Sequence, residues 1–261
     1  MHRSDQAENK IYDELRDEEL LRYSRQIMLP KFDIAGQLSL KNASVLILGL
    51  GGLGSPAALY LGAAGVGTLV LADDDEVDLS NLQRQVIHSQ QSIGQAKVES
   101  AAAQLSRINP HIKCECINAR LEGAALKAAI SKVDLVLDCS DNFATRFQIN
   151  QHCVETQTPL ISAAAIRMEG QITVYDARDP DSPCYQCLYP DGSEQDMTCS
   201  ESGVMSPLVG ILGSMQAMEA IKLLSGLGES LVGKLLILDA MSMQWRSLKL
   251  KKDPKCSCCS R

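Results

Sequence analysis

The stretch from Ser44 to Gln85 places a glycine-rich loop between an apolar run and a helix-forming run. Gly49, Gly51 and Gly54 make the pattern G-x-G-x-x-G directly after "SVLIL". This spacing lets a strand turn sharply into a helix, whose first N–H groups then face an anion. A second apolar run, "TLVLAD", ends at Asp73, where an acid can accept hydrogen bonds from a ribose. The stretch therefore predicts an α/β sheet that binds a nucleotide.

The first half of the chain alternates strand-like and helix-like segments. The apolar runs are typical of strands buried on both faces, as a parallel sheet covered by helices requires. We expect a Rossmann-like, doubly wound and mostly parallel sheet. Its predicted strands cover residues 44–49, 68–73, 112–119 and 134–140, and its predicted helices cover 55–64, 96–108 and 123–130.

The second half is expected to extend this sheet with antiparallel strands. "GQITVYDA" alternates like a half-exposed strand, and a turn-rich crossover covers 177–203. A long helix is predicted over 207–225, and Met205, Met215 and Met218, in or just before it, are expected to fill the core rather than to bind a partner. We predict one domain, 1–261, made of a helix and a polar connection (14–43), a nucleotide-binding half (44–142) and a second half (143–261). In that second half, strands are expected at 159–165, 170–177, 234–240 and 245–250.

Charge and hydropathy exclude several classes of protein. The formal net charge of −7 argues against general binding to nucleic acid or to a membrane surface. The polar N-terminus lacks the apolar segment of a secretory signal. The least polar run, 202–218, is shorter than the ~20 apolar residues that span a bilayer. We expect a soluble, cytoplasmic protein.

Residues downstream of the glycine loop favour ATP over NAD as the nucleotide. The helix terminus alone can serve the pyrophosphate of NAD, whereas a triphosphate needs further cations and Mg²⁺. Arg84 and Lys97 could supply the cations, and Asp141, after "DLVLDCS", could bind the metal. Each has an alternative reading, because the two cations could be solvated and Asp141 could cap the next helix. Together they favour ATP with Mg²⁺.

Several motifs resemble those of the adenylyltransferases that activate ubiquitin-like sulfur carriers. They are "RYSRQI", "GLGGLGS", "DLSNLQRQ", "GQAKVES", "INPHI" and "LDCSDN", and the resemblance spans Glu14 to Cys259. "SAAAIRMEGQITVYD" resembles the molybdopterin-synthase branch, whereas "PAALYLGAAGVGTLVLADDD" and "MQWRSLKL" are also similar to the thiamine branch. The resemblance implies that the C-terminal glycine of a small carrier ending in Gly-Gly is adenylated by ATP. The carrier would be the small subunit of molybdopterin synthase, in molybdenum cofactor biosynthesis, or alternatively the thiamine-pathway carrier.

The resemblance also assigns roles to individual residues. It implies that Asp73 holds the ribose, that Lys97 meets the phosphates, and that Arg25 reaches into the site of a neighbouring subunit in a homodimer. It implies catalytic roles for Arg25, Arg84, Lys97 and Asp141, and leaves open one for Cys199, which some relatives link covalently to their carrier. A separate protein is expected to donate the sulfur, because the chain ends at Arg261. The nucleotide-binding set is Gly49, Gly51, Gly52, Gly54, Asp73, Ser80, Asn81, Leu82, Gln83, Arg84, Lys97, Asp141 and Asn142.

The cysteines predict a metal site. "CYQC" and "CSCC" provide two C-x-x-C pairs, Cys184 with Cys187 and Cys256 with Cys259, which suit a structural, tetrahedral Zn²⁺. Cys258 could replace one ligand or remain a free thiol. Four further cysteines are expected to be small buried hydrophobic residues: Cys114, Cys116, Cys139 and Cys153.

Two rival functions remain open at this point. An NAD-dependent oxidoreductase would share the glycine motif, but no paired His and acid or Tyr and Lys stands out for hydride chemistry. A non-catalytic partner subunit could lack the phosphate cations, which are present here. The four histidines have no evident partner and are expected to be structural or exposed (His2, His88, His111 and His152).

Overall fold

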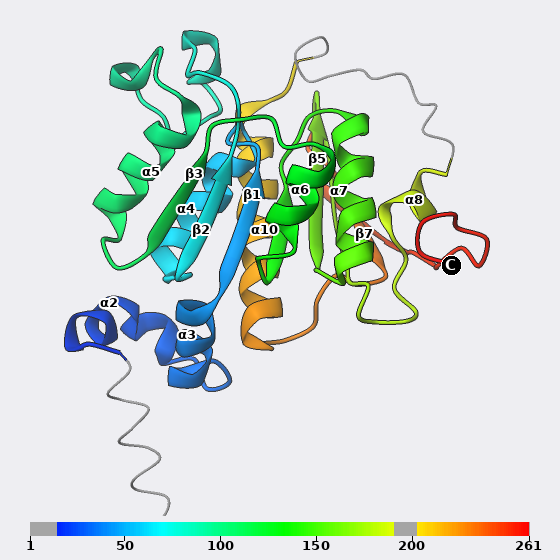
Figure 1. Ribbon diagram of the computed structural model, residues 1–261, viewed down its shortest axis with the longest axis horizontal. Helices are drawn as coiled ribbons and strands as arrows, with labels where there is room; N and C mark the ends of the chain where they lie inside the picture. The colour runs from blue at the N-terminus through cyan, green and yellow to red at the C-terminus, as the bar shows by residue number, and fades with distance from the viewer. Residues whose placement is uncertain (1–14, 191–202, 261) are drawn as a thin grey trace, which may run out of the picture.

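The computed structural model describes residues 15–190 and 203–260 (Figure 1). Within them, eight strands form one sheet in the order β3-β2-β1-β4-β5-β6-β7-β8. The parallel part comprises β1 (Ser44–Leu48), β2 (Thr68–Ala72), β3 (Lys113–Ile117), β4 (Leu135–Asp138) and β5 (Leu160–Ile166). The antiparallel part comprises β6 (Glu169–Tyr175), β7 (Lys234–Asp239) and β8 (Gln244–Lys249). The predicted mostly parallel sheet with an antiparallel extension is confirmed.

Helices cover both faces of the sheet. One face packs against α4 (Gly54–Ala64), α5 (Lys97–Ile108) and α10 (Ser206–Ser225), and the other against α6 (Gly123–Ile130), α7 (Phe143–Thr156) and α8 (Tyr185–Leu188). Successive side chains of a strand point to opposite faces, so Val45 and Ile47 join the first core and Leu46 and Leu48 the second. This two-sided burial explains why β1 is apolar at every position from Val45 to Leu48.

Two helices lie at the amino ends of the strands, opposite the glycine loop (Figure 1). They are α2 (Asp17–Ile27) and α3 (Asp33–Asn42). The Gln26 side chain donates to the carbonyl of Ala64, at the end of α4. The Asn109 amide donates to the Tyr23 hydroxyl at 2.8 Å. Because the glycine loop begins α4, these contacts place α2 at the far end of that helix.

Two local predictions were wrong. The polar connection expected before β1 contains α3, which buries Leu40 and packs the Gly36 backbone against the Phe32 ring. Strand β6 is buried at most of its positions rather than half-exposed. Its Gly170 faces the Leu212 side chain of α10, and its Tyr175 ring meets Tyr185 edge to face on the other side. Packing on both faces therefore overrides the alternating pattern.

Helix α10 is long and apolar enough, by length and composition alone, to cross a membrane. In this fold it is a core helix, because a Cβ added at Gly213 would lie 2.2 Å from the carbonyl oxygen of Leu53. The Gln216 side chain also donates to the carbonyl of Asp138 at 2.9 Å. The expectation that its methionines fill the core holds for Met215, which packs against it, but Met205 and Met218 are exposed.

Candidate nucleotide site and cysteine cluster

The glycine loop joins β1 to α4, and two of its glycines are required by geometry. Gly49 has φ +93°, and a Cβ there would lie 2.7 Å from the carbonyl oxygen of Cys139. A Cβ at Gly54 would lie 1.9 Å from the carbonyl oxygen of Gly49. At Gly51 the nearest atom to such a Cβ is the Gln85 amide nitrogen, 3.6 Å away. Gly51 is therefore open on the side from which a ligand could approach.

Asp73 follows β2 and holds the loop. Its carboxylate accepts hydrogen bonds from the backbone N–H of Leu50 at 2.6 Å and of Asp75 at 2.9 Å. Burial raises the pKa of Asp73, against the opposing effect of the Lys97 ammonium group and these two hydrogen bonds. The carboxylate is thus fixed beside the first turn of the glycine loop.

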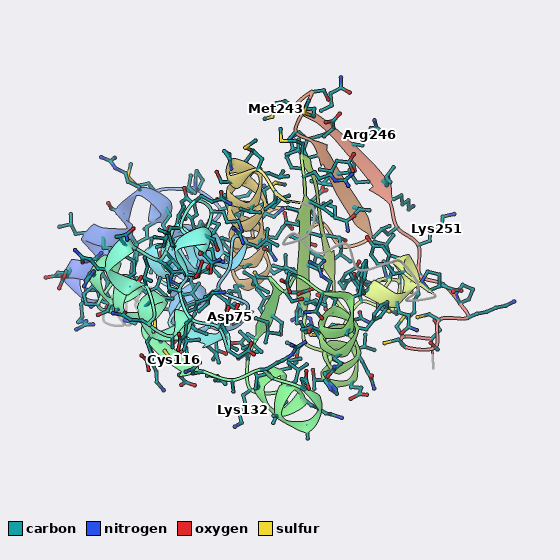
Figure 2. All side chains as sticks on the ribbon, turned by 90° about the horizontal axis from the view of Figure 1, so that it is seen from above. Asp75, Cys116, Lys132, Met243, Arg246 and Lys251 are labelled. Atoms are coloured by element: carbon teal, nitrogen blue, oxygen red, sulfur yellow. The ribbon has the colours of Figure 1, made fainter. Side chains whose placement is uncertain are left out.

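Lys97 begins α5 and is buried rather than solvated. Its ammonium group donates to the Asp75 carboxylate at 2.6 Å and lies 4.0 Å from that of Asp73. Its own backbone N–H donates to the carbonyl of Asp75. The alternative of a free surface charge is therefore wrong for Lys97. In the view from above, Asp75 lies near the middle of the molecule (Figure 2).

The segment after Asp73 carries the residues predicted to meet the phosphates. Asp78 caps a short 3₁₀ turn, Leu79–Asn81, by accepting from the N–H and hydroxyl of Ser80. The Arg84 guanidinium donates to the Ser80 carbonyl at 3.1 Å, and Arg84 is half-buried. Asn81 and Leu82 are also half-buried, while Ser80 and Gln83 are exposed. The turn thus keeps these side chains together next to the Asp73 end of the sheet.

The loop after β4 brings in the last predicted pair. Asn142 is the N-cap of α7, since its side chain accepts from the N–H of Thr145 at 2.9 Å. The predicted alternative, that Asp141 caps this helix, is therefore wrong. Asp141 is exposed, and its carboxylate accepts from the Asn142 side chain at 3.3 Å. Because Gly49 packs on Cys139 and donates to the carbonyl of Ala72, the glycine loop lies between the Asp141 and Asp73 segments.

Arg25 does not join this group. It is an exposed residue on α2, at the opposite end of the sheet from the glycine loop (Figure 1). It therefore cannot contribute to the nucleotide site of its own chain in this arrangement.

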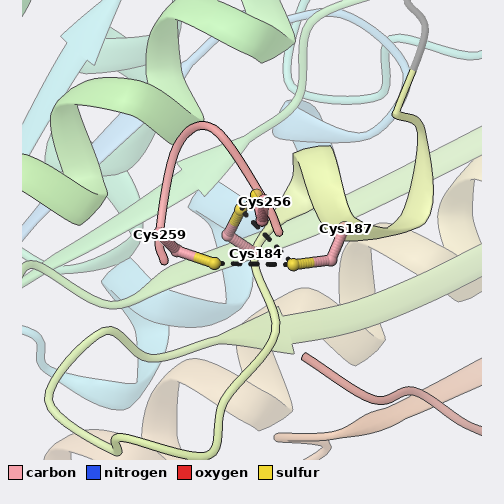
Figure 3. Close-up of side chains that lie close together, drawn as sticks. All are labelled: Cys184, Cys187, Cys256 and Cys259. Atoms are coloured by element: carbon pink, nitrogen blue, oxygen red, sulfur yellow. Dashed lines mark hydrogen bonds between the residues drawn. The ribbon is translucent and has the colours of Figure 1, made fainter. Parts of the chain in front are cut away.

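Four cysteines from two distant segments come together (Figure 3). The Sγ of Cys184 lies 3.6 Å from that of Cys256 and 3.9 Å from that of Cys187, and the Sγ of Cys187 lies 3.5 Å from that of Cys259. Sulfurs around a tetrahedral Zn²⁺ with Zn–S bonds of about 2.3 Å are separated by about 3.8 Å. The cluster has the composition and spacing of a closed zinc site.

The remaining cysteines fall into three groups. Cys258 lies outside the group of four, and its sulfur accepts from the Asn150 side chain at 3.4 Å. Cys139 and Cys153 are buried as predicted, but Cys116 is exposed and Cys114 only half-buried, because β3 is an edge strand. Cys199 lies outside the described residues.

Comparisons with known proteins identify the family. Residues 23–258 match the ThiF family. The chain belongs to the ThiF family. This ThiF-family chain is 54% identical to the Escherichia coli K12 molybdopterin-synthase adenylyltransferase, over 95% of its own length and 99% of the relative. It is 49% identical to the sulfur carrier protein ThiS adenylyltransferase of the same organism, over 94% and 97% of the two chains. A crystal structure of E. coli MccB with ATP shares the fold, with a TM-score of 0.79, 24% identity, and coverage of 91% of this chain and 73% of that one.

Sequence reasoning missed three residues of the candidate nucleotide site in this ThiF-family protein. Asp75 pairs with Lys97, and Gln85 is buried beside Gly51 with its carbonyl oxygen unpartnered within the described residues. His88 is buried beneath the loop, where one ring nitrogen lies 3.1 Å from the carbonyl oxygen of Leu50 and the other 2.9 Å from the Ser100 hydroxyl. Burial lowers the pKa of His88, which favours the neutral ring. The only available signal was that Asp75 and Gln85 lie within the motifs "DDD" and "LQRQ".

Proposed function

We propose that this protein catalyses the ATP-dependent adenylation of the C-terminal glycine of a small ubiquitin-like sulfur carrier. The observation that carries the proposal is the meeting of three segments at the carboxyl ends of the strands. The glycine loop lies between the loop of Asp141 and the paired Asp73 and Lys97. An anion-binding helix terminus, a ribose acceptor and a buried cation are the groups that ATP needs. The relatives named as adenylyltransferases, at 54% and 49% identity, support the same reaction.

The reaction follows from positioning and charge. A carboxylate oxygen of the carrier's terminal glycine attacks the α-phosphorus of ATP, and the bond from that phosphorus to the bridging oxygen breaks. The products are an acyl-adenylate and pyrophosphate, which keeps the electrons of the broken bond. Charge develops on the phosphate oxygens, so Arg84 and Lys97 would stabilise the transition state. The chain need not supply a nucleophile, because the carrier brings its own.

Asp141 is the residue that we assign to Mg²⁺. It is exposed at the end of β4, next to the glycine loop, and a carboxylate oxygen is a ligand that Mg²⁺ prefers. When bound with ATP, Mg²⁺ would neutralise charge on the phosphates. Asn142 fixes the backbone beside Asp141 through its role as N-cap.

We assign a structural Zn²⁺ to the four-cysteine cluster. The cluster joins the segment after β6 to the C-terminal segment, which are far apart in sequence. Its sulfurs are fully used by a tetrahedral ion, so no position is left for substrate. Such a metal would stabilise the fold rather than take part in the reaction.

We also infer a homodimer in which Arg25 completes the partner's site. Arg25 is exposed and lies far from its own glycine loop. Large apolar side chains are exposed on and just after α2, on α4 and α10, and in the segment after Asp73, which suits two copies packed about a twofold axis. These exposed residues are Leu21, Met28, Leu29, Tyr60, Leu79, Val86 and Met218.

The test is carrier-dependent exchange of labelled pyrophosphate into ATP. We expect exchange with a carrier ending in Gly-Gly and none with the same carrier lacking its last glycine. The absence of exchange with every such carrier would refute the adenylation. Lys97→Met is the loss-of-function variant, and Lys113→Met, in an exposed ion pair with Glu115, is its matched control.

The same assay distinguishes the molybdopterin carrier from the thiamine-pathway carrier as the substrate. We propose the molybdopterin carrier as the substrate because of the higher identity to that relative, 54% against 49%. The thiamine-pathway carrier is the second candidate. Running both carriers side by side should give the larger kcat/KM with the molybdopterin carrier, and the reverse order would reassign the branch.

A further inference from the structure

Arg146 is a buried arginine that the proposed reaction does not use. It lies one turn into α7, and its side chain is removed from solvent. One terminal nitrogen of its guanidinium donates to the carbonyl of Ser140 at 2.7 Å and to the carbonyl of Ala163, on β5, at 3.1 Å. Burial is the largest single effect and opposes the charged guanidinium, but the Asp138 carboxylate together with Tyr185 and Tyr189 outweighs it, so the pKa of Arg146 is raised. The charge is therefore kept inside the protein by a specific partner.

Asp138 holds the same residue, Ser140, from the opposite side. Its buried carboxylate accepts from the backbone N–H of Ser140 at 3.0 Å and from the Ser140 hydroxyl at 2.6 Å. Its other oxygen accepts from the Ser162 hydroxyl at 3.0 Å. The N–H, hydroxyl and carbonyl of Ser140 are thus all engaged by one buried pair, Asp138 and Arg146.

This arrangement fixes the backbone on both sides of Asp141. Ser140 is held by the buried pair, and Asn142 is held as the N-cap of α7. Asp141 lies between these two fixed residues, with its own side chain exposed. The backbone position of Asp141 is therefore set by Ser140 and Asn142, and through Ser140 by the buried Asp138 and Arg146.

The same face of α7 continues to the cysteine cluster. Asn142, Arg146 and Asn150 are spaced four residues apart, which places them along one side of the helix. The Asn150 side chain accepts from the N–H of Tyr185, in the segment between Cys184 and Cys187, at 2.8 Å. The Tyr185 ring packs on Phe147, and its hydroxyl interacts electrostatically with the guanidinium of Arg146. Figure 1 shows α7 beside α8.

We propose that Arg146 is a positioning residue that holds the Asp141 loop in the geometry needed for Mg²⁺. The inference rests on the proposed function, because it concerns the residue assigned there to the metal. Residues that orient a metal-binding carboxylate without touching the metal typically change metal affinity or activity by about 10–100-fold when they are replaced. The expected signature is a change in Mg²⁺ dependence rather than in carrier binding.

Arg146→Lys is the test variant, because it keeps the charge opposite Asp138 but loses the planar fork that serves two carbonyls. We expect the Mg²⁺ concentration that half-saturates pyrophosphate exchange to rise about tenfold. The KM for the carrier should stay within about twofold, as should kcat at saturating Mg²⁺. The control is Arg120→Lys, in an exposed ion pair with Glu122, which should match the wild type. Zinc content measured in both variants should equal that of the wild type.

Amide hydrogen exchange gives a second readout that does not depend on activity. Arg146→Lys should speed exchange at residues 140–145 and leave α5 unchanged. An unchanged Mg²⁺ dependence together with unchanged exchange would overturn the proposal, as would a loss of kcat alone. If the wild type shows no pyrophosphate exchange with any carrier, the proposed function fails. In that case faster hydrogen exchange confined to residues 140–145 still supports the positioning role, and unchanged exchange overturns it.

Discussion

At the scale of single residues, Asp73 shows how the fold changes the chemistry of a side chain. Burial raises the pKa of this carboxyl, while the Lys97 ammonium group and two backbone hydrogen bonds act in the other direction. The net effect is a pKa above the ordinary value of 3.8. The folded protein therefore holds the proton of Asp73 more tightly than the unfolded chain does. Ionisation of this residue consequently lowers the free energy of unfolding as pH rises from 3.8 through the raised value.

Nucleotide binding should weaken on mild acidification. In the site that we propose, an ionised Asp73 would accept hydrogen bonds from the ribose, and its raised pKa means that it becomes protonated at a higher pH than an ordinary aspartate. We expect the Kd for ATP, measured by calorimetry from pH 7 downward, to increase before the pH reaches 3.8. Asp73→Asn should bind weakly, with little dependence on pH in this range. The neighbouring exposed Asp74→Asn should follow the wild-type curve, and a pH-independent wild type would contradict the role of Asp73.

At the scale of elements, the junction between β1 and α4 depends on close contact between backbones. Gly54 approaches the Gly49 carbonyl so closely that a side chain has no room. The sharp turn places the amino end of α4 beside the Asp73 and Asp141 segments. The motif is therefore a requirement for packing as well as for binding.

Gly54→Ala should destabilise the protein by about 3 kcal/mol, because the added Cβ would overlap the carbonyl oxygen of Gly49. Gly210→Ala is the matched control, since Gly210 lies inside α10 with nothing within 4 Å of a Cβ. It should stabilise the helix by about 0.5–1 kcal/mol. Urea denaturation of both variants measures the two changes. A smaller loss for Gly54→Ala than for Asp74→Asn would contradict this account.

The cysteine cluster makes a prediction that separates neighbouring thiols. Cys256→Ser removes one of the four grouped sulfurs, so we expect loss of bound zinc and a lower Tm. Cys258→Ser leaves that group intact and should retain one zinc ion per chain. Zinc is measured by elemental analysis of the purified protein. If Cys256→Ser kept its zinc and Cys258→Ser lost it, Cys258 rather than Cys256 would be the zinc ligand.

At the scale of the whole molecule, Arg25 and the glycine loop lie at opposite ends of the sheet, as the shared site that we propose requires. A variant without Arg25 and a variant without Lys97 should each be inactive, but for different reasons. In a mixed dimer, the Arg25→Ala chain keeps Lys97 and receives Arg25 from the Lys97→Met chain. One site per mixed dimer is then complete.

Mixing the two variants after subunit exchange should restore about one quarter of the wild-type activity, since half of the dimers are mixed and each has one complete site. Pyrophosphate exchange measures the recovery. A mixture of Arg84→Ala with Lys97→Met is the control and should remain inactive, because both residues belong to the site of the same chain. Failure of the first mixture to recover would refute the shared site.

The sequence by itself determined the order of the strands along the chain, the glycine loop, the two cysteine pairs and the family, because these depend on local periodicity and fixed spacing. It could not show that Lys97 is buried against Asp75, that Asn142 rather than Asp141 caps α7, or that α3 forms before β1. Those outcomes depend on contacts between segments distant in the chain. Lys97 looks like an ordinary lysine in the sequence, but in the fold it is buried and paired with Asp75. The loop around Ser140 looks merely polar in the sequence, but in the fold Asp138 and Arg146 hold Ser140 in place. Only the tertiary structure brings those partners together.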